Sequence, residues 1–187
     1  MNKNLVILDR DGVINIDYGY IGSLERFEYT DFIWGLLDFC VNLKYDALIV
    51  TNQSGVARGF FDEGAVETIH SKIRSDFKAA GVNLVDIKTC FHHPDAKIWK
   101  YRTICSCRKP APGMLQDFFK ATDYSPSDSV LIGDKVSDVE CGNRLGIPSF
   151  LLNETGDLDK LDWSLVKIQK SVSPLLTALR KTRASIF

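Results

Sequence analysis

Short runs of consecutive apolar residues alternate along this chain with longer segments in which apolar residues recur every three or four positions. The short runs predict buried strands at residues 5–8, 47–50, 85–89, 130–132 and 149–152. The longer segments predict helices over residues 33–43 and 66–80, a helix opened by Pro112, and one through Val139 and Leu145 that ends at Gly146. A weak strand near 166–168 and a helix opened by Pro174 are predicted for the tail.

This alternation is typical of an α/β fold, a doubly wound parallel sheet with helices on both faces. A chain of 187 residues suits a single domain, 1–187, and no insertion between the predicted elements leaves room for a large cap domain. The net charge of −1 gives no basic field for nucleic acid or an anionic membrane. Only four consecutive apolar residues precede Asp9, so we expect no signal peptide and a cytoplasmic location. We also expect a monomer.

Polar residues suited to phosphate chemistry follow three of the predicted strands. Asp9 and Asp11 follow the first, Thr51-Asn52 end the second, and Asp134 follows the fourth. Ligands of such sheets bind at the carboxyl ends of the strands, and buried acids need a cation. The alternative is that the aspartates only form a turn and a helix cap.

A second cluster of chemistry lies between residues 90 and 107. Cys90, His92, Cys105 and Cys107 offer three thiolates and one imidazole, the ligands of a closed structural zinc site. The intervening residues 95–104 are polar and show no core stripe, so a metal is expected to anchor this zinc loop. His93 is a neighbour or an alternative ligand. The alternative is three reduced thiols, while Cys40 and Cys141 are expected to be packing residues.

Four segments resemble the four motifs of the haloacid dehalogenase superfamily of phosphotransferases: Asp9-x-Asp11-Gly12-Val13, Val50-Thr51-Asn52, Lys109-Pro110 and Gly133-Asp134-x-x-x-Asp138. The resemblance implies a Rossmann-like fold, Asp9 as nucleophile and Asp11 as acid and base. It also implies Mg²⁺ held by Asp9, Asp134 and the Asp11 carbonyl. Thr51 and the Asn52 amide would hold the transferred phosphoryl group beside Lys109. Asp138 would orient Lys109 or a metal-bound water.

The zinc loop narrows the resemblance. Cys-x-His-His-Pro and Cys-x-Cys-Arg-Lys-Pro, with the segment 51–59, are similar to the D-glycero-D-manno-heptose 1,7-bisphosphate 7-phosphatases and in part to histidinol-phosphate phosphatases. The resemblance implies a magnesium-dependent hydrolase of a phosphorylated sugar in heptose and lipopolysaccharide precursor synthesis. Histidinol-phosphate phosphatase and a non-catalytic, zinc-stabilised module are the alternatives. The substrate residues implied are Asp17, Tyr18, Gly19, Tyr20, Thr51, Asn52, Gln53, Ser54, Arg108, Lys109 and Lys135.

Arg108 directly follows the expected zinc ligand Cys107 and directly precedes Lys109. A zinc-fixed Cys107 would aim this arginine, and a guanidinium fork suits a second phosphate on the substrate. Arg58 either reaches the same place or lies on the surface. The chain departs from the heptose group at Val13 and Tyr18, where members often carry threonine and histidine.

Overall fold

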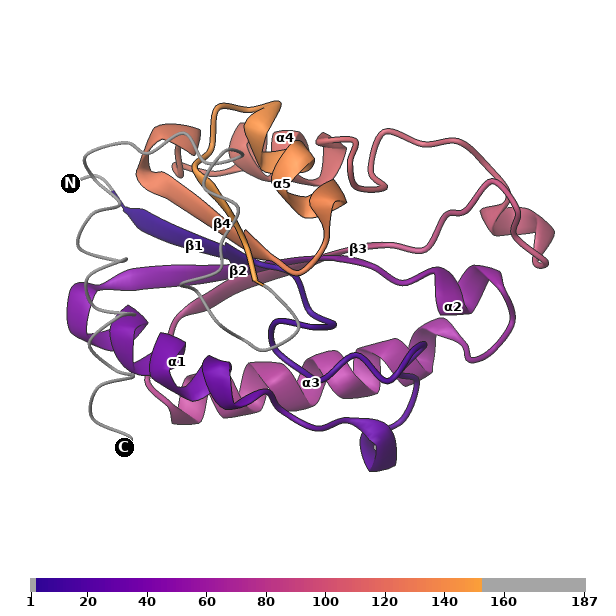
Figure 1. Cartoon of the computed structure of the whole chain (residues 1–187), viewed down its shortest axis with the longest axis horizontal. Coiled ribbons are helices and arrows are strands. Elements are labelled where there is room, and N and C mark those ends of the chain that lie inside the picture. The colour runs from indigo at the N-terminus through magenta and orange to yellow at the C-terminus, as the bar shows by residue number, and fades with distance from the viewer. Residues whose placement is uncertain (1–2, 153–187) are drawn as a thin grey trace.

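The computed structural model describes residues 3–152, which form the predicted α/β fold around one parallel sheet (Figure 1). The strand order is β3-β2-β1-β4-β5, and every neighbouring pair is parallel. The strands are β1 (Asn4–Leu8), β2 (Tyr45–Asn52), β3 (Leu84–Cys90), β4 (Ser129–Gly133) and β5 (Ser149–Leu151). All five predicted strands are therefore confirmed. The strand and helix expected in the tail lie outside the described residues.

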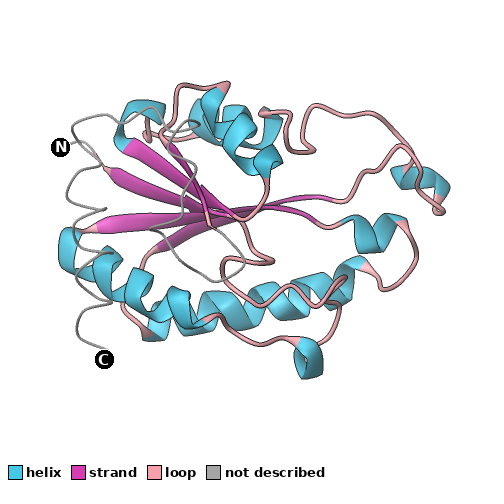
Figure 2. Ribbon diagram, viewed as in Figure 1, coloured by secondary structure: helices cyan, strands magenta, loops and turns pink. Residues whose placement is uncertain are grey.

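Helices cover both faces of the sheet, as a doubly wound fold requires (Figure 2). Helices α1 (Asp31–Leu43) and α3 (Glu63–Ala79) pack on one face, and α4 (Gly113–Ala121) and α5 (Val136–Asn143) on the other. The predicted extension of the last helix through Leu145 was wrong, because the chain turns there and the N–H groups of Leu145 and Ile147 both reach the Gly142 carbonyl. The short helix α2 (Ser54–Ala57) was not predicted.

Alternation along β1 divides the hydrophobic core into two layers. Val6 and Leu8 pack with the residues of α1 and α3, whereas Leu5 and Ile7 pack with those of α4 and α5. Cys40 and Cys141 are buried in these layers, one in each, as expected of packing residues.

The strand order reverses direction at β1, whose neighbours are β2 and β4. Leu8 pairs with Ile132, and the Asp9 N–H continues the ladder by donating to the Ile132 carbonyl at 3.0 Å. Such a switch point opens a crevice at the carboxyl ends of the strands. It brings the ends of β1 and β4, which are far apart in sequence, side by side.

Residues 95–104 have an apolar anchor of their own, although the sequence predicted a polar segment without a core stripe that a metal would anchor. Ala96 and Tyr101 are buried in a small cluster with Val56, Ala57 and Val66. Tyr101 ends a 3-10 helix, Trp99–Tyr101, and its hydroxyl donates to Glu63. No helix within residues 3–152 is long and apolar enough to cross a bilayer.

Candidate active site

Three carboxylates meet at the carboxyl ends of β1 and β4. Asp9 follows β1, Asp134 follows β4 and Asp138 lies in the first turn of α5, with ligand oxygens within 4.8 Å of one another. Burial and the charge of Asp9 raise the pKa of Asp134 to about 7. The Asp134 Oδ1 atom is buried and has no hydrogen-bond partner. A free carboxylate oxygen beside two further carboxylates fits Mg²⁺, which prefers hard oxygen ligands.

Lys109 completes this cluster from the loop before α4. Its ammonium Nζ lies 2.7 Å from Asp9 Oδ1, from Asp138 Oδ1 and from the Val50 carbonyl oxygen. Burial alone would lower the pKa of Lys109, but the charges of Asp9 and Asp138 outweigh it and raise that pKa. When all three carboxylates are ionised, they and the ammonium together carry two negative charges, which one divalent cation balances. Asp138 thus contacts Lys109, one of the two roles expected for it.

Two glycines allow this close packing. A Cβ atom on Gly12 would lie 2.2 Å from Asp134 Oδ2, and the Gly12 φ of +89° favours glycine in any case. A Cβ atom on Gly133 would lie 2.2 Å from the Cβ of Asp138. The glycines that follow Asp11 and precede Asp134 are therefore part of the architecture of the acid cluster.

The Asp11 carboxylate is held by a separate network. It accepts hydrogen bonds from Arg10 Nη2 at 2.7 and 2.8 Å, from Asn15 Nδ2 at 2.9 Å and from Gln53 Nε2 at 2.7 Å. Gln53 Nε2 also donates to Thr51 Oγ1 at 2.8 Å. Arg10 and Asn15 are fully buried and were missed from the sequence. Arg10 could have been found from its place near the end of a buried strand, because a buried cation needs a carboxylate partner.

The side chain of Asn52 joins β2 to the Lys109 segment. Its Nδ2 donates to the Lys109 carbonyl and its Oδ1 accepts from the Lys109 N–H, both at 3.1 Å. Its side-chain amide was a candidate for holding the phosphoryl group, but in the structure it is bound to Lys109. Asn52 therefore fixes the backbone of Lys109, whose ammonium contacts Asp9.

The loop Asp17–Tyr20 is tied to the same end of the sheet. Lys135 Nζ lies 3.1 Å from Asp17 Oδ2 and 3.6 Å from Asp134 Oδ2. Arg26 donates to the carbonyls of Tyr18 and Gly19, at 3.0 and 3.2 Å. Tyr18 is exposed and donates to Glu28. Lys135 thus links the expected substrate loop to the acid cluster.

The expected zinc ligands converge. The sulfur atoms of Cys90, Cys105 and Cys107 and a ring nitrogen of His92 lie within 4.8 Å of one another. His92 Nδ1 is 3.3 Å from Cys107 Sγ, and among the described residues His93 is not part of the group. Three thiols and one imidazole around a common centre fit tetrahedral Zn²⁺. Arg108, the next residue, donates from Nη1 to the His92 carbonyl at 3.3 Å, so it is held against this loop.

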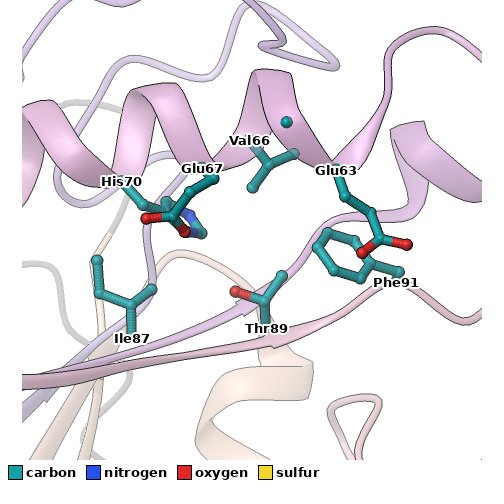
Figure 3. A pocket seen from close by; sticks show the side chains of 8 residues that line it. Glu63, Val66, Glu67, His70, Ile87, Thr89 and Phe91 are labelled. Carbon is teal, nitrogen blue, oxygen red and sulfur yellow. The ribbon is translucent and has the colours of Figure 1, made fainter.

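A cavity of about 350 Å³ lies between α3 and the end of β3 (Figure 3). His70, Thr89 and Phe91 are among the residues that line it. Burial, with the positive charges of Arg10 and Arg74, lowers the pKa of His70 to about 3, so its imidazole is neutral. None of the lining residues belongs to the phosphate motifs.

Comparisons with known proteins agree with this geometry. A family model described as HAD-hydrolase-like matches residues 106–167. The chain is 40% identical to the D-glycero-alpha-D-manno-heptose-1,7-bisphosphate 7-phosphatase of Photorhabdus laumondii, with 81% of this chain and 83% of that protein covered. The chain belongs to the heptose-bisphosphate phosphatase family of the haloacid dehalogenase superfamily. It is a phosphoric monoester hydrolase, as the sequence predicted.

Two further relatives are named as heptose-bisphosphate phosphatases. The beta-anomer enzyme of the same organism is also 40% identical, covering 81% of this chain and 80% of that protein. The solved D,D-heptose 1,7-bisphosphate phosphatase of B. bronchiseptica, complexed with magnesium and phosphate, is 26% identical. It superposes with a TM-score of 0.74 over 96% of this chain and 99% of that chain. The chain is thus equally identical to one relative named for the alpha anomer and one named for the beta anomer.

Proposed function

We propose that this phosphatase removes the 7-phosphate of D-glycero-D-manno-heptose 1,7-bisphosphate in a magnesium-dependent reaction, in heptose and lipopolysaccharide precursor synthesis. The observation that carries the proposal is the buried cluster of Asp9, Asp134 and Asp138 around Lys109, with two net negative charges and one carboxylate oxygen free. The family's substrate supports the choice of sugar. We further propose that the enzyme acts as a monomer in the cytoplasm.

In this proposal Asp9 is the nucleophile. One Asp9 carboxylate oxygen attacks phosphorus, the bond from phosphorus to the sugar oxygen breaks, and an aspartyl-phosphate forms on Asp9. Lys109, 2.7 Å from Asp9 Oδ1, stays protonated and neutralises charge on the transferred group. Asp9, Asp134 and the Asp11 carbonyl would hold Mg²⁺, which supplies further positive charge at the phosphoryl oxygens when bound.

Asp11 is the general acid and general base in this proposal. As the acid it gives its proton to the departing sugar oxygen, and as the base it takes a proton from the water that then attacks phosphorus and releases Asp9. Gln53 bonds both Asp11 and Thr51, so one amide fixes the acid and base relative to the hydroxyl assigned to the phosphoryl group. The Arg10 fork orients the Asp11 carboxylate from behind.

The remaining residues would recognise the sugar and its second phosphate. Arg108 is the candidate for that phosphate, because the zinc loop holds it one residue before Lys109. Zn²⁺ bound by Cys90, His92, Cys105 and Cys107 would have a structural role, since four protein ligands leave no open position. Asp17–Tyr20, Ser54 and Lys135 are proposed to face the sugar.

The test is phosphate release from the heptose bisphosphate with and without Mg²⁺, with histidinol phosphate as the competing substrate and both anomers supplied. We expect Mg²⁺-dependent turnover with kcat/KM at least about 100-fold higher for the bisphosphate, since hydrogen bonds to the charged second phosphate, at about 1.5–3 kcal/mol each, have no counterpart in histidinol phosphate. Asp9→Asn should abolish release, and Asp38→Asn, an exposed acid on α1, should not. Unchanged release by Asp9→Asn would sink the nucleophile assignment, and preference for histidinol phosphate would overturn the substrate.

A further inference from the structure

Arg58 and His93 meet at a contact that the reaction described above does not use. Arg58 follows helix α2, and His93 follows the zinc-loop residue His92. Arg58 Nη2 lies 3.2 Å from His93 Nε2. A guanidinium can only donate hydrogen bonds, so this distance is satisfactory only if the imidazole nitrogen accepts.

The hydrogen bond at the other ring nitrogen, Nδ1, shows that Nε2 does not accept. The backbone N–H of Asp95 donates to His93 Nδ1 at 3.0 Å, so Nδ1 carries no proton. An imidazole keeps at least one proton, which must then be on Nε2. The contact therefore brings two N–H donors face to face with no acceptor between them. Arg58 Nε, a third donor, is buried and has no hydrogen-bond partner.

Positive charge accumulates at the same place. Arg58 contacts His93 directly, and Arg108 is held against the carbonyl of the neighbouring residue His92. Within residues 3–152 neither guanidinium forms an ion pair with a carboxylate. Convergent, unneutralised donors are the features of a site for an anion.

The cluster also lies on the substrate side of the molecule. The Arg58 guanidinium is 5.8 Å from the centroid of the Tyr20 ring, which packs on Phe60 at 4.7 Å. Tyr20 belongs to the loop tied to Asp134 through Lys135, and Arg108 precedes Lys109. Arg58 and His93 thus lie where this loop, α2 and the zinc loop come together.

We propose that Arg58 and His93 are specificity-determining residues that bind, together with Arg108, the substrate phosphate that is not cleaved. A phosphate oxygen between Arg58 and His93 Nε2 would accept from both donors and so remove the conflict between them. The identification of this anion as a sugar phosphate rests on the proposed function. The existence of an anion site rests only on the convergence of the donors.

Steady-state kinetics on two substrates tests the inference: the heptose 1,7-bisphosphate and the heptose 7-phosphate, which lacks the second phosphate. Arg58→Ala should lower kcat/KM for the bisphosphate about 30-fold, or about 2 kcal/mol, mostly through KM. For the monophosphate the change should stay within about 3-fold. Arg74→Ala, which removes an arginine from the outer side of α3, is the matched control and should change neither value.

His93→Gln separates anion binding from a structural role. A glutamine oxygen can accept from Arg58, so the variant should keep its zinc content and its Tm while KM for the bisphosphate rises about tenfold. Equal losses on both substrates, or no loss on the bisphosphate in either variant, would overturn the assignment of Arg58 and His93. A wild-type enzyme that hydrolyses neither heptose would overturn the proposed function instead.

Discussion

Magnesium affinity should depend on pH, because Asp134, a carboxylate assigned to the metal, takes up a proton as the pH falls through about 7. In the metal-free protein, burial and the charge of Asp9 raise the pKa of Asp134 from 3.8 to about 7. Mg²⁺ binds the carboxylate, so proton and metal compete for the same oxygens. A group with a raised pKa gives up its proton on metal binding, and affinity falls as the pH drops through that pKa.

The size of the effect follows from the ionised fraction of Asp134. With a pKa of about 7, roughly nine-tenths of the groups are ionised at pH 8, half at pH 7 and a tenth at pH 6. The apparent Kd for Mg²⁺ should therefore rise about tenfold between pH 8 and pH 6, or about 1.4 kcal/mol. At pH 7 each Mg²⁺ should displace about half a proton.

Calorimetric titration with Mg²⁺ at pH 6, 7 and 8 measures both quantities, when each pH is run in two buffers of different ionisation enthalpy. Asp134→Asn should bind Mg²⁺ more weakly and lose most of the pH dependence, because an amide does not titrate. Asp38→Asn on the surface of α1 is the control for loss of an acid and should behave as wild type. Equal Kd values at pH 6 and pH 8, with no proton release, would refute the reasoning.

Three further outcomes follow from the structure. Gly12→Ala should lower kcat at least about tenfold, since its Cβ would collide with Asp134 Oδ2 and its φ is +89°; near wild-type turnover would contradict the role of this glycine. His70→Phe should reduce the decrease in the free energy of unfolding that the wild type shows as the pH falls. The pKa of His70 is about 3 in the folded state and 6.5 in the unfolded state, so below pH 6.5 only the unfolded state takes up the proton. In urea unfolding, the wild type should therefore lose up to about 1.4 kcal/mol of stability per pH unit relative to the variant. Wild-type and variant stabilities that fall in parallel with pH would argue against a neutral His70. Replacing Cys105 and Cys107 by serine should remove one zinc per chain and lower Tm, and a wild-type protein without zinc by metal analysis would exclude the site.

The strands and most of the helices were predictable because side-chain burial repeats with the period of the backbone. The four apolar residues before Asp9 predict a buried strand, because they form a short apolar run between polar residues. Gly81 and Pro112 mark the end of one helix and the start of another through their backbone preferences. The end of α5 was less predictable. Leu145 packs partly against the core from the turn that follows the helix, and the sequence pattern is the same as if it lay in the helix. Ala96 and Tyr101 were also missed, since the sequence does not distinguish them from the nearby Ile98, Trp99 and Ile104, which are exposed.

The sequence by itself determined which chemistry-bearing residues follow which strands, because motif spacing and apolar runs are local properties of the chain. Only the tertiary structure decided their partners. The strand order sets β4 beside β1, which puts Asp134 next to Asp9, and the loop before α4 carries Lys109 back over a hundred residues of chain to the same carboxylate. The pairing of Arg10 with Asp11 and the opposed donors of Arg58 and His93 arise in the same way, since such contacts depend on where whole elements pack.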